Sequence, residues 1–173
     1  HTPDALKYTL ESIKEQFSNS SISIVFGCGG NRDKDKRPIM GKIANQYCNK
    51  IFLTDDNPRY ENPKKIRNQI KKKIVRSKLV EIASRKKAIK VSIENLNSGD
   101  ILLVAGKGHE IYQEYRGKKK NFSDKKYILK EINSKNKKLF KNWKANILNE
   151  ECNLSLVNKK LKINKASINS KNI

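Results

Sequence analysis

The chain has 173 residues, enough for one domain with a substantial core and part of another. Its 39 lysine and arginine residues against 17 aspartate and glutamate residues give a formal charge of +22. This excess is mostly lysine, is spread over most of the chain and comes with few aromatic residues, which argues against a specific nucleic-acid surface. We therefore expect only weak, salt-sensitive binding to nucleic acid.

The three cysteines, Cys28, Cys48 and Cys152, form neither close pairs nor metal-type spacings. We expect reduced thiols and no metal site. No apolar run approaches the roughly 20 residues that span a bilayer, and no basic segment followed by a long apolar one opens the chain. A cytoplasmic protein without membrane insertion is expected.

The predicted elements begin with a helix that Thr2 caps and that has Pro3 in its first turn. A short apolar run at 22–26 predicts a buried strand, which enters a glycine loop at 27–30. A second amphipathic helix is expected to begin at about Pro38. The inward-facing positions of these two helices are Leu6, Leu10, Ile13, Phe17, Met40, Ile43, Ala44 and Tyr47.

The alternation continues with a strand at 51–54, a helix from Pro63, a short strand at 79–82, a helix at 85–96 and a strand at 101–105. The helix from Pro63 is expected to turn Ile66, Ile70 and Ile74 inward. Strands that alternate with helices predict an α/β fold with a mostly parallel, doubly wound, Rossmann-like sheet. Segments 112–116 and 120–122 predict an antiparallel hairpin at one edge, and Ser123 is expected to cap a helix that ends near 132.

Residues 134–146 are rich in lysine and asparagine and are expected to form a linker. Residues 147–173 carry spaced apolar positions among more lysines. They are either a disordered tail or the start of another unit.

Ligands of an open parallel sheet bind beyond the carboxyl ends of its strands, so the loops after 22–26, 51–54 and 101–105 are expected to converge. The middle loop contains Asp56, Asn57, Pro58 and Arg59. An arginine fork, an amide and a stiffening proline suit recognition of a carboxylate. An ordinary polar turn uses the same residue types.

The first loop adds Arg32 and Asp33 after three glycines, and it lacks the third glycine position of a dinucleotide fingerprint. Nearby Lys34, Lys36 and Arg37 are expected to be solvated.

The third loop has glycines at 106 and 108, with Lys107, His109 and Glu110 around them, and it is not a Walker A sequence. A carboxylate there can hold an ammonium group. Arg32 and Arg59 with Glu110 therefore suit a ligand that has a carboxylate and an amine, such as an amino acid.

Five ordered segments carry a resemblance to a known family: HTPDAL at 1–6, VFGCGGNRDKDKRPIM at 25–40, TDDNPRYENP at 54–63, VAGKGHE at 104–110 and FSD at 122–124. Together they resemble the C-terminal domain of the Mur ligases, in particular the members that add 2,6-diaminopimelate. The resemblance covers residues 1 to about 133.

The resemblance implies an ATP-dependent ligase that adds meso-diaminopimelate to UDP-MurNAc-L-Ala-D-Glu in peptidoglycan synthesis, through an acyl phosphate that the amine attacks. It implies that Asp56, Asn57, Pro58 and Arg59 recognise the amino acid, with Arg59 and Asn57 on a carboxylate and Arg32 assisting. Gly106 and Glu110 are implied at the far amino-acid end of the ligand, and His1 near the ATP phosphates. The intact tetrapeptide favours diaminopimelate over lysine.

The family's central ATPase domain, which would bind most of the ATP and Mg²⁺, has no counterpart in these 173 residues. Residues 1–133 are thus expected to be a C-terminal domain without its first strand, inactive when alone. Residues 147–173 are also similar to the opening of a D-alanyl-D-alanine-adding Mur ligase, although Asn169 and Lys171 stand where an acid and an arginine are expected. Two further functions stay open: a stand-alone amino-acid-binding module and a basic nucleic-acid-binding protein.

Overall fold

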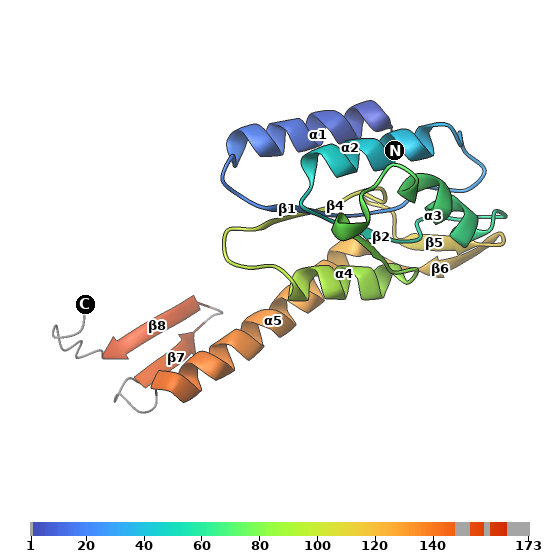
Figure 1. The fold of residues 1–173 in the computed structure, drawn as a ribbon. Coiled ribbons are helices and arrows are strands. Elements are labelled where there is room, and N and C mark those ends of the chain that lie inside the picture. The colour runs from blue at the N-terminus through green and yellow to red at the C-terminus, as the bar shows by residue number, and fades with distance from the viewer. Residues whose placement is uncertain (1, 148–152, 158–159, 166–173) are drawn as a thin grey trace. The chain divides into compact units, whose positions relative to one another are not determined.

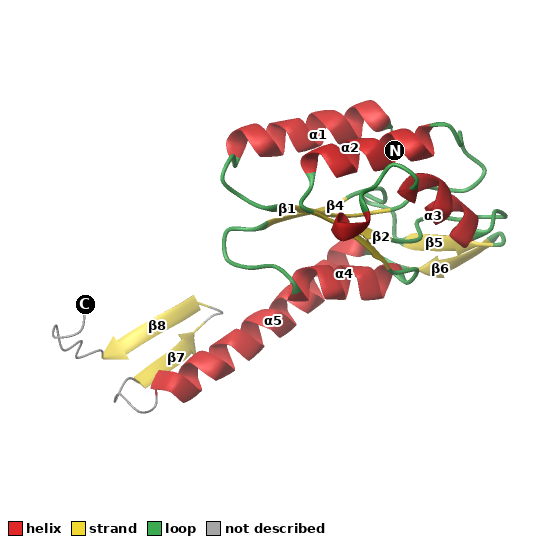
Figure 2. Cartoon of the chain, in the orientation of Figure 1, coloured by secondary structure: helices red, strands yellow, loops and turns green. Residues whose placement is uncertain are grey.

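The computed structural model describes residues 2–147, 153–157 and 160–165. The chain divides into two compact units, His1–Glu131 and Ile132–Ile173. Figure 1 labels the elements along the chain and Figure 2 distinguishes helices from strands.

The first unit is built on a four-stranded parallel sheet with the order β3-β2-β1-β4. Its strands are β1 (Ile22–Phe26), β2 (Lys50–Leu53), β3 (Leu79–Glu81) and β4 (Ile101–Val104). The helices of this unit before the last one are α1 (Pro3–Gln16), α2 (Lys36–Tyr47), α3 (Pro63–Lys71), the 3₁₀ turn η1 (Arg76–Lys78) and α4 (Arg85–Glu94). The alternation of strand and helix confirms the predicted parallel α/β fold.

Helices cover both faces of this sheet because successive strand side chains point to opposite sides. In β1, Ile24 and Phe26 pack into a core with residues of α1, α2 and α3, whereas Val25 packs into a second core with residues of α4. Figure 2 shows α1 and α2 on one side of the sheet and α4 on the other. The doubly wound arrangement is therefore confirmed.

Helix α1 begins as predicted, because the Thr2 hydroxyl accepts a hydrogen bond from the Ala5 amide at 3.2 Å. Its buried side chains are Leu6 and Leu10. The prediction for Phe17 is wrong: the helix ends at Gln16, the backbone of Phe17 is no longer helical, and its side chain is 50% exposed.

The predicted antiparallel hairpin is present as β5 (Tyr112–Tyr115) and β6 (Lys118–Asn121). Its predicted place at the edge of the parallel sheet is wrong, because the two strands form a separate sheet of their own. The turn has positive φ at Arg116 (50°) and Gly117 (73°), as a tight two-residue hairpin turn requires. A single parallel bridge joins Tyr115 to Arg59. The hairpin thus attaches to the loop that follows β2.

The last helix, α5 (Asp124–Ile147), is longer than predicted. It was expected to end near residue 132, but its sequence has no glycine or proline and is rich in lysine, a good helix former, so it continues through the expected linker at 134–146. Two further strands, β7 (Asn153–Val157) and β8 (Lys160–Lys165), pair antiparallel. The assignment of 147–173 stays a prediction, and part of that segment lies outside the described residues.

Candidate functional site

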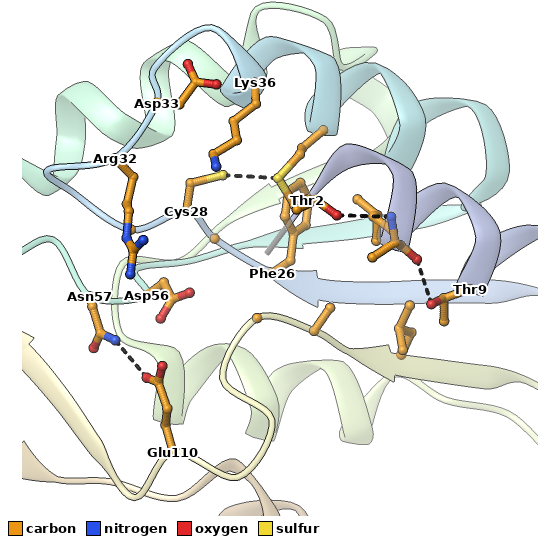
Figure 3. Close-up of a pocket in the computed structure, with 18 of the residues that line it drawn as sticks. Thr2, Thr9, Phe26, Cys28, Arg32, Asp33, Lys36, Asp56, Asn57 and Glu110 are labelled. Carbon is orange, nitrogen blue, oxygen red and sulfur yellow. Dashed lines mark hydrogen bonds between the residues drawn. The ribbon is translucent and has the colours of Figure 1, made fainter.

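The three strand-end loops converge on one cavity of about 200 Å³ (Figure 3). It is bounded on one side by the start of α1 and on the other by the loops that follow β1, β2 and β4. Six of the seven predicted substrate-binding residues line it: Arg32, Asp56, Asn57, Arg59, Gly106 and Glu110. The structure therefore brings together side chains that lie up to 78 positions apart in the sequence (110 − 32 = 78).

Pro58, the seventh residue, is buried and does not line the cavity. Its carbonyl oxygen would lie 1.9 Å from a Cβ atom built on Gly30, and the Gly30 amide donates to the Asn57 carbonyl at 2.8 Å. Only glycine fits there. Pro58 therefore packs against the first loop and fixes its position relative to the second loop. Its place outside the cavity lining does not support a direct contact with a ligand.

Arg59 lines the cavity and has a left-handed backbone conformation, with φ at 52°. Its backbone is fixed by the hairpin, because its amide donates to the Glu114 carbonyl and its carbonyl accepts from the Arg116 amide. The guanidinium donates from Nη1 to the Gly30 carbonyl at 2.8 Å, and its Nε lies 3.7 Å from the Glu114 carboxylate. Backbone and side chain are thus both held in place before any ligand arrives.

Arg32 differs from Arg59, because its side chain is exposed and has no hydrogen bond or ion pair within the described part of the chain. Figure 3 shows it extending from the first loop toward Asp56 and Asn57. The two arginines thus give the cavity one fixed and one adaptable guanidinium.

Asn57 is almost fully buried and has a defined amide orientation. Its Oδ1 accepts hydrogen bonds from the Lys107 ammonium at 2.8 Å and the Glu114 amide at 2.9 Å. Since both partners are donors, the oxygen must face them, and Nδ2 then donates to Glu110 Oε2 at 2.8 Å. The amide is a link between the second and third loops.

Asp56 is 2% exposed and lines the cavity. Its Oδ1 lies 3.3 Å from Lys107 Nζ but has no hydrogen-bond partner in suitable geometry. Gly106 has φ at 113°, and a Cβ atom there would lie 3.0 Å from Asp56 Oδ2. Gly106 therefore makes room for this carboxylate.

The neighbouring Asp55 fixes the base of the second loop. It pairs with Arg67 of α3 and accepts a hydrogen bond from the Tyr115 hydroxyl at 3.1 Å. Burial raises the pKa of Asp55 although Arg67 opposes the shift, and burial together with the adjacent Asp55 raises the pKa of Tyr115. Gln113 adds bonds from its amide nitrogen to the Asp55 and Asp56 carbonyls, at 3.1 and 2.8 Å.

Arg37 corrects the prediction of a solvated basic face. It is fully buried, and its guanidinium binds both oxygens of Glu61 at 2.9 Å and the Gly29 carbonyl at 3.1 Å. Glu61 also accepts from the Asn31 amide at 2.6 Å. Arg37 therefore clamps the first loop to the second, whereas Lys34 is exposed and Lys36 lies half-buried at the cavity.

This clamp predicts acid sensitivity. The Arg37 hydrogen bonds lower the pKa of Glu61 to about 2, against partial burial, which acts in the opposite direction. The unfolded chain therefore takes up a proton before the folded chain does, and stability present above about pH 4.5 is lost as the pH falls toward 2. Glu61→Gln should remove roughly 2 kcal/mol of this pH dependence, measured as the free energy of unfolding between pH 6 and pH 3. Equal pH slopes for the two proteins would contradict the clamp.

The inner wall of the cavity is apolar, with Phe26, Met40 and Leu103 beside Cys28. Burial raises the pKa of the Cys28 thiol to about 12, and its Sγ lies 3.7 Å from the Met40 sulfur. The thiol is therefore protonated and a poor nucleophile at neutral pH.

The remaining predictions concern phosphate binding, metal binding and membrane insertion. His1 lies outside the described residues, and His109 is exposed and does not line the cavity. Within the described part of the chain, no group of three or more His, Cys, Asp or Glu side chains is placed to hold a metal ion. No helix among those residues is long and apolar enough to cross a membrane.

Three features of the site were not predicted from the sequence: the burial of Lys107, the clamp of Arg37 on Glu61, and a buried pair behind the third loop. In that pair Arg85 binds both oxygens of Asp124 at 2.8 and 2.7 Å and donates to the Ala105 carbonyl at 2.8 Å. Asp124 belongs to the FSD segment, so the sequence motif includes this residue. The motif does not identify Arg85 as its partner.

Comparison with known proteins gives consistent matches. Residues 1–108 match the family described as "Mur ligase, glutamate ligase domain". The UDP-N-acetylmuramoyl-L-alanyl-D-glutamate–2,6-diaminopimelate ligase of Rickettsia conorii is 52% identical over 131 residues, 75% of this chain and 27% of that protein. The ligase of the same name from Chlorobaculum tepidum is 49% identical over 129 residues, 74% of this chain and 25% of that protein.

A solved structure of a UDP-N-acetylmuramoyl-L-alanyl-D-glutamate–2,6-diaminopimelate ligase superposes with a TM-score of 0.73 and 43% identity, over 79% of this chain and 28% of that one. The chain thus spans about a quarter of the length of the relatives it matches. The family match covers more than half of the chain, and the fold agrees with it. The chain belongs to the Mur ligase family, of which it carries the domain described as the glutamate ligase domain.

Proposed function

We propose that this chain is the amino-acid-binding domain of an ATP-dependent ligase that adds meso-diaminopimelate to UDP-MurNAc-L-Ala-D-Glu in the cytoplasm, during peptidoglycan synthesis. One observation carries the proposal: six predicted residues from three separate loops line a single cavity. The names of the relatives supply the substrates.

The charges of the cavity suit one end of an amino acid. Arg32 and Arg59 present guanidinium groups, which bind carboxylates in a planar, two-pronged geometry. Asp56 and Glu110 present carboxylates, which attract an ammonium group. Diaminopimelate has an amino-acid group at each end, so one end is held in the cavity and the other amine is left to react.

In this proposal ATP and Mg²⁺ are bound mainly by a central ATPase domain of the ligase rather than by the described residues. They contain no carboxylate or histidine cluster that fits a metal ion. The lysine of the third loop, Lys107, has a fully buried side chain bonded to Asn57 and Tyr112, so its ammonium group is turned away from any phosphate at the surface. When bound elsewhere in the ligase, ATP would activate the glutamate carboxylate; the described residues bind and orient the incoming amine.

The domain assignment belongs to the same proposal. Residues 1–133 form the C-terminal domain, and 147–173 are similar to the start of a second Mur ligase. Two alternatives predict other results. A stand-alone amino-acid-binding module would bind diaminopimelate but support no ligation when joined to the ATPase domain of a ligase, and a basic nucleic-acid-binding protein would bind nucleic acid in a salt-resistant way.

Calorimetric titration of the 173-residue chain with meso-diaminopimelate and with L-lysine tests the proposal. Lysine has a carboxylate at one end only. If its side-chain amine occupies the cavity, the contacts between a carboxylate and the two arginines are lost. In the other orientation, the end outside the cavity has no carboxylate. We expect binding of diaminopimelate at least tenfold tighter than that of lysine. Equal affinity for the two, or no binding of diaminopimelate, would contradict the proposed substrate.

A further inference from the structure

Lys107 is a buried cation that the proposed function leaves without a role. Its side chain is 0% exposed, although lysine is almost never fully buried unless it is paired. Its Nζ donates to Asn57 Oδ1 at 2.8 Å and to the Tyr112 carbonyl at 2.7 Å. It also lies 3.3 Å from Asp56 Oδ1 and 3.5 Å from Glu110 Oε2.

These contacts place one ammonium group behind three of the side chains that line the cavity. Lys107 itself does not line the cavity, so it does not touch the ligand there. Its four partners belong to three segments: Asp56 and Asn57 to the second loop, Glu110 to the third, and Tyr112 to the hairpin. Lys107 therefore joins the segments whose relative position sets the shape of the site.

Among its contacts, the hydrogen bond from Lys107 to Asn57 has the clearest consequence, because it fixes the orientation of the Asn57 amide. Lys107 is one of the two donors that occupy Oδ1, the other being the Glu114 amide. While both are present, Nδ2 must point toward Glu110 and the cavity. Without Lys107, one of the two hydrogen bonds to Oδ1 is lost, and this orientation of the amide is less strongly favoured over the flipped one.

We propose that Lys107 is a positioning residue for amino-acid recognition: it acts through Asn57 and orients the donor face of that amide toward the ligand. The inference rests on the proposed function, because it takes diaminopimelate as the ligand.

If Lys107 acted only through its charge, replacing it would strengthen ligand binding rather than weaken it. Lys107 partly offsets the charges of Asp56 and Glu110, so its removal makes the floor of the cavity more negative and strengthens its attraction for an ammonium group. A positioning role predicts weaker binding. The direction of the change therefore separates the two.

A double-mutant cycle on diaminopimelate affinity, measured by titration of the full 173-residue chain, tests the inference. The four proteins are the wild type, Lys107→Met, Asn57→Ala and the double variant. Methionine has a similar volume without the ammonium group. We expect Lys107→Met to weaken binding roughly tenfold in the wild type and less than about twofold when Asn57 is already alanine.

Ile89→Ala is the matched control, since Ile89 is fully buried in the core beneath α4, away from the cavity. It should lower stability and leave the affinity for diaminopimelate within about twofold of the wild type. If Lys107→Met does not fold, Lys107→Leu, which also removes the donor to Asn57, replaces it in the same cycle.

Unchanged or tighter binding by the Lys107 variant, or equal losses with and without Asn57, would overturn the positioning role. Those outcomes leave the proposed function standing, because the wild type still binds. Absence of binding by the wild type would instead overturn the proposed function.

Discussion

Arg59→Ala should lower kcat/KM for diaminopimelate by roughly 10- to 100-fold, mainly through a higher KM. The arginine is prepositioned by its bonds to Gly30 and to the hairpin, so a carboxylate meets a fixed guanidinium at little entropic cost. Loss of a charge-assisted, two-pronged contact accounts for the size of the effect. The assay uses the Rickettsia conorii ligase in which this chain replaces the matching 131 residues.

Two matched variants sharpen this prediction. Arg59→Lys keeps a positive charge but loses the planar fork, so it should recover only a small part of the activity. Arg76→Ala removes an exposed arginine of η1 that does not line the cavity, and should have no effect. An Arg59→Ala enzyme with unchanged KM and kcat for diaminopimelate would rule out the carboxylate contact.

Arg85→Ala should destabilise the chain by about 3 to 5 kcal/mol and lower its melting temperature by roughly 10 °C. The substitution leaves the carboxylate of Asp124 buried without its partner, and it frees the Ala105 carbonyl at the end of β4. Thermal and urea unfolding of the purified chain measure the loss. Because Ala105 directly precedes Gly106, the third loop of the site should also loosen.

A double variant separates the unpaired charge from the lost packing. Arg85→Met with Asp124→Leu replaces the buried pair by apolar side chains, which often costs little or nothing. It should be more stable than Arg85→Ala. If Arg85→Ala unfolds at the same temperature as the wild type, the pair does not hold α4, β4 and the start of α5 together.

The sheet and the convergence of its loops could be predicted because both depend on local signals. Short apolar runs mark buried strands, and alternation with amphipathic helices fixes a parallel topology. Because the carboxyl ends of parallel strands lie at one edge of a sheet, the sequence predicts that Arg32, Asn57 and Glu110 come together there. All three residues line the cavity in the structure.

The buried charges could not be predicted, because their partners are far away in the sequence. Arg37 follows the half-buried Lys36 and the exposed Lys34 in the sequence, and its partner Glu61 is 24 positions later. Lys107 occupies a glycine-flanked loop position that suggests a surface cation, yet its acceptor on Asn57 is 50 positions earlier. Only the fold brings such pairs together, and composition alone favours a solvated interpretation for any lysine or arginine.

Helix ends were the other source of error. Phe17 fits the apolar period of α1 but lies one residue past its end, where the side chain no longer follows the helical face. The end of α5 was placed too early, because a lysine-rich sequence can be either a helix or a linker when no glycine or proline interrupts it.

The most direct measurement is ligation by the Rickettsia conorii ligase that carries this chain in place of its matching segment. Supplied with ATP, Mg²⁺ and UDP-MurNAc-L-Ala-D-Glu, it is offered meso-diaminopimelate and L-lysine in separate reactions. We predict ADP release and product formation with diaminopimelate and at least tenfold lower kcat/KM with lysine. Equal use of both amino acids, or selective use of lysine, would contradict the claim that these three loops select diaminopimelate.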